Sequence, residues 1–194
     1  MKKRGGCLRF VFFVLIAIAV LYFTVGNGKT VILKKIYPIK YQQYVEEYAE
    51  EFSLDKNLVY AVIKIESNFD ENAVSVAGAK GLMQLMDRTA EDCSKKAGFD
   101  YIIPADLFVP EKNIRLGCYY ISQLMSIYND TELAITAYNG GTGNVEKWLS
   151  DPEYSDGEGG LSDIPYKETK DYVKKVMDAF EKYNRLYKTN EQEY

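Results

Sequence analysis

Apolar side chains recur at helical spacing along most of the chain after residue 40, which predicts helices that each bury one face. The strict alternation of apolar and polar residues that is typical of strands does not rise above noise. We therefore predict an all-α fold with one small irregular lobe. The expected helices cover residues 41–52, 58–66, 89–97, 114–128, 132–138 and 167–187.

Breaks in the pattern indicate where these helices begin and end. Ser53 or Asp55 is suited to cap the second helix, because a short polar side chain can satisfy free N–H groups at a helix start. The glycines within residues 78–81 interrupt the pattern, and the Asn-Gly-Gly run at 139–141 is a stop signal. Residues 151–163 are acidic and contain glycines, which predicts a loop.

The N-terminus is basic up to residue 9 and then apolar, without a charge, over residues 10–25. Such a run is typical of a signal-peptide core or a short membrane span, and the missing small-x-small cleavage site favours a retained single-pass anchor. The basic tip would stay in the cytoplasm and the rest would lie outside the membrane. The alternative is secretion after signal cleavage. We divide the chain into a basic tip with anchor (1–28), a linker (29–40), a helical domain (41–188) and a polar tail (189–194).

Composition excludes several kinds of chemistry. The chain has no histidine, whereas serine and cysteine nucleophile sites and most hydrolytic zinc sites use imidazole. Cys7, Cys93 and Cys118 match no metal-ligand spacing, so we expect no metal bound by these cysteines. We expect Cys93 and Cys118 to be small buried residues, with a disulfide as the alternative. The net charge is −4, five basic residues and no acid precede Thr30, and the remainder therefore has nine acids in excess, which argues against a nucleic-acid partner.

One carboxylate falls at the end of an apolar helix face. In the second predicted helix, one face carries the following residues at helical spacing: Val59, Val62, Ile63 and Glu66. A carboxylate held against apolar surface loses hydration, and this raises its pKa towards the value that a general acid needs near neutrality. The alternative is a glutamate at a helix end that turns into solvent.

A glycine-bounded turn follows that helix. Residues 78–84 read Gly-Ala-Lys-Gly-Leu-Met-Gln, and glycines allow backbone to approach a ligand closely. Gln84 has both donors and an acceptor, which suits sugar hydroxyl and acetamido groups, although an ordinary turn is the alternative. No base is available to activate Ser67, so we expect this residue to make local hydrogen bonds rather than to act as a nucleophile.

Taken together, residues 41–187 resemble the catalytic domain of soluble, goose-lysozyme-related lytic transglycosylases, which implies a lysozyme-like helical fold. The resemblance is carried by four segments in the family's order: Ile65-Glu66-Ser67, residues 75–86 (SVAGAKGLMQLM), Ala137-Tyr138-Asn139, and residues 164–173 (IPYKETKDYV). Two departures concern turn geometry. Asp87 stands where a proline often follows, and Asp70-Glu71 replaces a common Asn-Pro.

The resemblance implies that Glu66 is the catalytic acid/base. The residues that it implies bind or orient the glycan are Ser75, Gln84, Met86, Tyr138, Asn139 and Glu168. The implied enzyme is a carbon–oxygen lyase that cleaves the β-1,4 bond between N-acetylmuramic acid and N-acetylglucosamine and leaves a 1,6-anhydro ring. It needs no metal or cofactor.

Two other functions fit the same residues. A goose-type muramidase would share the fold and Glu66 but would deliver water to the anomeric carbon. A non-catalytic glycan-binding subunit of an envelope assembly would keep the fold as a scaffold. In each case the expected partners are peptidoglycan glycan strands and, through the anchor, the cytoplasmic membrane.

Overall fold

The computed structural model describes Val14, residues 28–99 and residues 103–187. The chain divides into two compact units, residues 1–38 and residues 39–194. In the first unit, residues 28–36 are helical. No helix among the described residues is long and apolar enough to cross a membrane. The predicted anchor over residues 10–25 lies outside the described residues, except for Val14.

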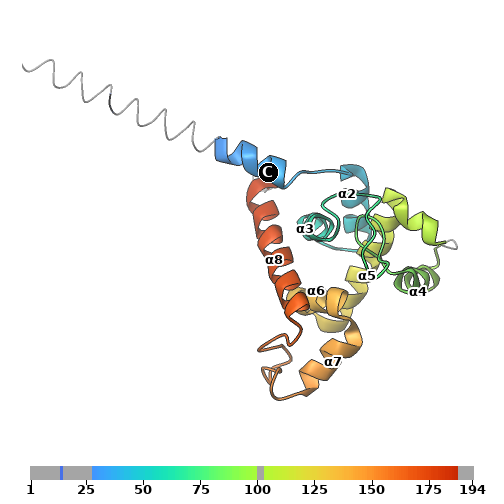
Figure 1. The fold of residues 1–194 in the computed structure, drawn as a ribbon, viewed down its shortest axis with the longest axis vertical. Helices are drawn as coiled ribbons and strands as arrows, with labels where there is room; N and C mark the ends of the chain where they lie inside the picture. Colours follow the sequence, from blue (N-terminus) through green and yellow to red (C-terminus); the bar gives the residue numbers. More distant parts are fainter. Residues whose placement is uncertain (1–13, 15–27, 100–102, 188–194) are drawn as a thin grey trace, which may run out of the picture. The chain divides into compact units, whose positions relative to one another are not determined.

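The second unit is built from helices around a common core (Figure 1). In chain order they are α2 (Gln42–Glu51), α3 (Lys56–Glu66), α4 (Asp87–Ala97), the 3₁₀ helix η1 (Pro104–Phe108), α5 (Pro110–Tyr128), α6 (Thr131–Gly140), α7 (Thr142–Ser150) and α8 (Lys167–Tyr187). Between the described residues there are isolated antiparallel bridges but no strands. The all-α prediction is therefore confirmed, with η1 and α7 as additional helices.

Helix α3 is the centre of this unit. Its residues 58–63 are buried, so that both of its sides are covered by other helices, most extensively by α8. The Tyr60 ring stacks on Tyr183 of α8 with 5.6 Å between centroids. Asp55, one of the two predicted caps, accepts a hydrogen bond from the Asn57 N–H at 2.8 Å and begins the helix. The packing leaves the last residue of α3, Glu66, at the edge of the core.

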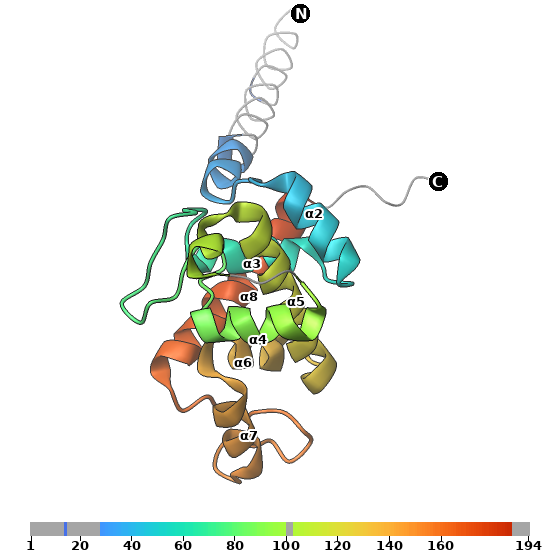
Figure 2. The same cartoon turned by 90° about the vertical axis from the view of Figure 1, so that its right-hand side faces the viewer.

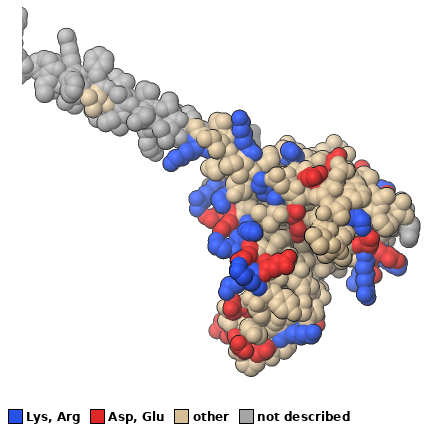
Figure 3. Space-filling view, in the orientation of Figure 1, with Lys and Arg blue, Asp and Glu red and all other residues tan. Residues whose placement is uncertain are grey.

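The outer face of α8 alternates basic and acidic side chains (Figure 3). These form ion pairs one helical turn apart, among them Lys167–Asp171, Lys174–Asp178 and Arg185–Glu181. Exposed pairs of this kind contribute roughly 0.3–0.5 kcal/mol each. Helix α8 is therefore held in place by its buried face, which carries Thr169, Tyr172, Val173, Val176, Ala179 and Tyr183.

The loop between α3 and α4 projects from the helices and is the irregular lobe that we predicted (Figure 2). Two antiparallel bridges, Val74 with Lys80 and Lys80 with Leu85, fold it back on itself. Gly81 has a φ of +75°, and a Cβ at this position would lie well inside contact distance of the Leu107 carbonyl oxygen. The return of the loop onto the helices therefore depends on a residue without a side chain.

Cys93 and Cys118 are both buried free thiols, as expected. Burial raises the pKa of the Cys93 thiol to about 11 and that of Cys118 further. Both are therefore unreactive thiols at neutral pH. Cys7 lies outside the described residues.

Replacement of Gly81 by alanine should lower the free energy of unfolding by roughly 2–5 kcal/mol, because left-handed strain and overpacking add together. Gly78→Ala is the matched control: its φ is +88° but nothing lies within 4 Å of an added Cβ. This variant should lose only about 1–2 kcal/mol. Thermal unfolding of the full chain in mild detergent measures both. Equal losses would show that the close approach at Gly81 is no constraint.

Candidate active site

Glu66 is the last residue of α3 and is partly buried. The Tyr172 hydroxyl, on the buried face of α8, donates a hydrogen bond of 2.6 Å to Glu66 Oε1. The carboxylate therefore does not turn freely into solvent, and the alternative of an ordinary exposed helix-end glutamate is wrong.

Burial raises the pKa of Glu66 from its ordinary value of 4.5 to about 7, against the opposing effect of the Tyr172 hydrogen bond. No carboxylate among the described residues contributes to this pKa. The site thus has one acidic group that exchanges its proton near neutrality. This single group can serve as a general acid when protonated and as a general base when ionised.

Tyr138 on α6 forms a second side of the site. Burial raises the pKa of Tyr138, and the next largest cause is the negative charge of Glu66, which places the phenol within electrostatic reach of the carboxylate. The Tyr138 hydroxyl, however, donates to the Met83 carbonyl oxygen at 2.7 Å. Tyr138 therefore connects α6 to the projecting loop and leaves Tyr172 as the donor to Glu66.

Gln84 is partly buried in the same loop, with a φ of +47°. Its Nε2 donates to the carbonyl oxygens of Ala73 at 3.0 Å and Gly81 at 2.9 Å. Both amide donors are thus used within the loop. This corrects our expectation that Gln84 offers donors and an acceptor to a sugar: the group it has to offer is the carbonyl oxygen Oε1.

Ser67 performs the local role expected of it. Its hydroxyl lies 2.8 Å from the Leu82 carbonyl oxygen and accepts the Phe69 N–H at 3.1 Å. This residue follows Glu66 directly, so the end of α3 is connected to the projecting loop beside the carboxylate.

Ser75 and Met86 lie in the projecting loop and are exposed. The Ser75 hydroxyl accepts the Ala79 N–H at 3.0 Å and closes the turn at the loop's tip. Met86 directly precedes α4. The neighbouring Asp87, which stands where the family often has proline, pairs with Lys80 at 2.6 Å, so an ion pair closes this turn. The hydrogen bonds of the Ser75 and Glu66 side chains go to other residues, Ala79 and Tyr172.

Asn139 and Glu168 are exposed at the adjoining ends of α6 and α8. These ends approach closely: a Cβ built on Gly140 would lie 3.2 Å from Thr169 Cγ2. Glu168 is four residues before Tyr172 and so shares its helix face, one turn away. Asn139 and Glu168 therefore lie on the side of the site that α6 and α8 form.

Two site residues were missed by the sequence reasoning. Tyr172 falls within the last quoted segment, but its role depends on Glu66, which lies 106 residues away. Asn113 on α5 is fully buried and accepts the Met83 N–H at 2.8 Å, while its Nδ2 donates to the carbonyl oxygens of Lys80 at 3.0 Å and Leu107 at 2.8 Å. The available signal was a polar residue on an otherwise apolar helix face.

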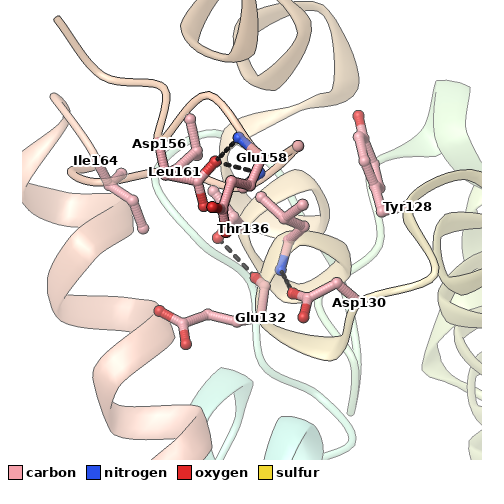
Figure 4. A pocket seen from close by; sticks show the side chains of 11 residues that line it. Tyr128, Asp130, Glu132, Thr136, Asp156, Glu158, Leu161 and Ile164 are labelled. Carbon is pink, nitrogen blue, oxygen red and sulfur yellow. Dashed lines mark hydrogen bonds between the residues drawn. The ribbon is translucent and has the colours of Figure 1, made fainter.

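A pocket of about 470 Å³ lies apart from these residues, between α6 and the loop that follows α7 (Figure 4). Two of its four carboxylates bind backbone N–H groups: Asp130 accepts from Leu133 at 2.7 Å and Asp156 from Gly160 at 2.8 Å. The pocket contains none of the candidate residues. The more exposed surface beside Glu66 is therefore the candidate site.

Comparison with known proteins defines the family. Residues 43–158 match the model of the transglycosylase SLT domain, and the chain belongs to this family. The soluble lytic murein transglycosylase of Salmonella typhimurium is 31% identical over 158 residues, which are 80% of this chain and 24% of that protein. The membrane-bound lytic murein transglycosylase C of Edwardsiella ictaluri is 37% identical over 121 residues, which are 57% of this chain and 34% of that protein.

A solved structure is similar throughout the helical unit. It is an inactive mutant of the lytic transglycosylase Slt from Pseudomonas aeruginosa, with a TM-score of 0.70 and 35% identity over 77% of this chain and 24% of that chain. The family and the lysozyme-like helical fold expected from the sequence are thus confirmed. The chain spans about a quarter of the length of the Salmonella and Pseudomonas proteins.

Tyr172→Phe should raise the pKa of Glu66 further above 7, because a hydrogen bond that stabilises the carboxylate is removed. A hydrogen bond to a charged group contributes roughly 1.5–3 kcal/mol, which corresponds to a shift of about one pH unit or more. NMR titration of the Glu66 carboxyl carbon measures it.

Tyr60→Phe is the control for this titration, since Tyr60 lies on the same helix and its buried hydroxyl has no hydrogen-bond partner among the described residues. The pKa of Glu66 should not change in this variant. A pKa that is also unchanged in Tyr172→Phe would contradict the assigned hydrogen bond.

Proposed function

We propose that the chain is a peptidoglycan lytic transglycosylase, a carbon–oxygen lyase that uses Glu66 as its single acid/base. Its reaction cleaves the β-1,4 bond between N-acetylmuramic acid and N-acetylglucosamine and forms 1,6-anhydromuramic acid ends. The observation that carries the proposal is the partly buried Glu66 carboxyl, whose pKa burial raises to about 7 without a contribution from any other carboxylate of the described residues. Membership of the transglycosylase family supports it.

The reaction begins with Glu66 protonated, a form that a pKa near 7 keeps populated at neutral pH. Glu66 donates its proton to the glycosidic oxygen as the bond to the anomeric carbon breaks. The leaving glycan departs with that proton as a hydroxyl group. The 2-acetamido group of the muramic acid residue stabilises the positive charge that develops on the ring.

The second half of the reaction returns the proton. Glu66, now ionised, takes the proton from the C6 hydroxyl of the same sugar, and the C6 oxygen bonds to the anomeric carbon. Glu66 is protonated again and no water is consumed. The step is intramolecular because the C6 hydroxyl and the anomeric carbon belong to the same sugar, and the enclosing residues would favour the reactive geometry.

The binding residues divide between the loop and the two helix ends. Gln84 Oε1 would accept a hydrogen bond from a sugar hydroxyl or acetamido N–H, while the Tyr138 ring forms the wall beside Glu66. Ser75 and Met86 would contact the strand from the projecting loop. Asn139 and Glu168 would contact it from the α6 and α8 side.

A goose-type muramidase is the nearest alternative, and it differs in using water in place of the C6 hydroxyl. The glycoside hydrolases that use water generally pair two carboxylates. A single catalytic carboxyl group with a pKa near neutrality therefore favours the transglycosylase over the muramidase. A non-catalytic glycan-binding subunit would have no need for the raised pKa of Glu66.

Glu66→Gln should lower muropeptide release from purified peptidoglycan by at least the roughly 10²- to 10⁴-fold that general acid-base catalysis supplies, because an amide can neither donate nor accept the proton. The solved Pseudomonas relative is itself described as an inactive glutamate-to-glutamine mutant. Mass analysis of the products should show 1,6-anhydro ends. Reducing ends would identify a muramidase, and near wild-type turnover by Glu66→Gln would contradict the catalytic assignment.

Unfolding measurements show whether this variant remains folded. The pKa of Glu66 is raised in the folded state, so its ionisation above pH 7 costs stability, whereas below its ordinary pKa of 4.5 there is no cost. Glutamine carries no such cost. The variant should therefore unfold at a higher temperature than the wild type above pH 7 and at a similar temperature below pH 4.5.

We also propose that the chain is a single-pass membrane protein with residues from about 29 onward outside the cytoplasmic membrane, as the charge-free run at 10–25 indicates. A relative described as membrane-bound supports this location. Cell fractionation should recover the full-length chain with membranes, released by detergent but not by high salt. Recovery of a shortened, freely soluble chain that lacks residues 10–25 would instead support secretion after cleavage.

A further inference from the structure

Tyr166 is a large aromatic residue that remains half exposed, with 50% of its surface accessible. It directly precedes α8, and its carbonyl oxygen accepts the Lys170 N–H at 2.9 Å, so that it begins the first turn of the helix. Its position is thus fixed by α8. The ring is nevertheless available to a ligand.

Trp148 supports this ring from α7. The two rings meet edge to face, with 5.0 Å between centroids and an interplanar angle of 81°. Trp148 itself is only 6% exposed. An aromatic pair of this geometry contributes about 0.5–1.5 kcal/mol beyond its buried area. The Tyr166 ring is therefore held in one orientation before any ligand arrives.

The aromatic pair adjoins the candidate active site. Trp148 lies against Gly140, where an added Cβ would be 3.4 Å from its Cη2 atom, and Gly140 directly follows Asn139. On the other helix, Tyr166 precedes Tyr172 by six residues, a rise of roughly 9 Å along α8. The Tyr172 hydroxyl donates a hydrogen bond of 2.6 Å to Glu66 Oε1. The exposed ring thus lies at the adjoining ends of α6 and α8, where Asn139 and Glu168 also lie.

A tyrosine ring has an apolar face and a polar hydroxyl, as a pyranose ring has an apolar C–H face and polar edges. We infer that Tyr166 binds an N-acetylhexosamine residue of the glycan by stacking, with Trp148 holding the ring in place. This inference rests on the proposed function for the identity of the glycan. It adds a binding position at the α7–α8 end of the site.

Trp148 is the one tryptophan in the chain, so its fluorescence reports directly on the environment of Tyr166. The experiment titrates full-length Glu66→Gln protein in mild detergent with a soluble β-1,4-linked oligomer of N-acetylglucosamine. A saturable change in the Trp148 emission is expected. Binding affinity is measured in parallel by calorimetry, because a substitution at Tyr166 also alters the emission of the unbound protein.

Tyr166→Ala in this background should weaken binding about tenfold, equivalent to ~1.4 kcal/mol. Tyr166→Phe keeps the stacking face and should retain most of the affinity. Tyr44→Ala on α2, a helix that packs against α3 and α5, is the matched control and should bind like the parent. With Glu66 intact, Tyr166→Ala should raise KM for peptidoglycan with little change in kcat.

Unchanged affinity and KM in a folded Tyr166→Ala variant would overturn the inference, as would the absence of saturable binding by the parent. The outcome for the proposed function is separate. Tyr166-dependent binding without any cleavage by the wild type would uphold the binding site and refute the enzyme. Cleavage that does not depend on Tyr166 would refute the binding site alone.

Discussion

The side-chain amide of Asn113 holds the projecting loop against α5, and the geometry around Glu66 follows from this attachment. The loop has no helix or strand of its own over residues 80–84, so its backbone groups must find partners elsewhere. Asn113 supplies two of them, to Lys80 and Met83, and its Nδ2 also donates to the Leu107 carbonyl oxygen of η1. Each buried backbone group left without a hydrogen-bond partner would cost roughly 1–3 kcal/mol. The bonds to Asn113 therefore favour this conformation of the loop over others.

The loop also provides the hydrogen-bond acceptor for one of the two tyrosine hydroxyls of the site, that of Tyr138. The Met83 N–H donates to Asn113 at 2.8 Å, and the Met83 carbonyl oxygen accepts a hydrogen bond from the Tyr138 hydroxyl at 2.7 Å. Among the described residues, the side-chain donor to the Glu66 carboxylate is Tyr172. Hydrogen bonds to a carboxylate lower its pKa and burial raises it, and here burial prevails.

The features that could be predicted from the sequence are those that depend on residues close together along the chain. The amphipathic stretches of α2, α3 and α8 were found because their periodicity is local. Helix α7 was missed, since only Val145 and Trp148 are buried in it and glycines flank its start. The position of Glu66 on the apolar face of α3 could likewise be predicted from helical spacing. Its bond to Tyr172 and the use of the Gln84 donors within the loop could not, because both depend on how distant segments are brought together.

A carboxyl that titrates near neutrality and acts alone imposes an order on the proposed chemistry. The same carboxyl must give a proton before it can accept one, so the nucleophile in the second step has to carry a proton of its own and lie close to the carboxylate. In the proposed reaction the sugar's C6 hydroxyl meets both conditions without a water-binding residue. A pKa near 7 serves both halves, since a much lower value would leave too little acid and a much higher one would leave the proton bound too tightly to be donated. In the proposed reaction, burial of Glu66 outweighs its hydrogen bond from Tyr172, and the resulting pKa would let this one residue perform both steps.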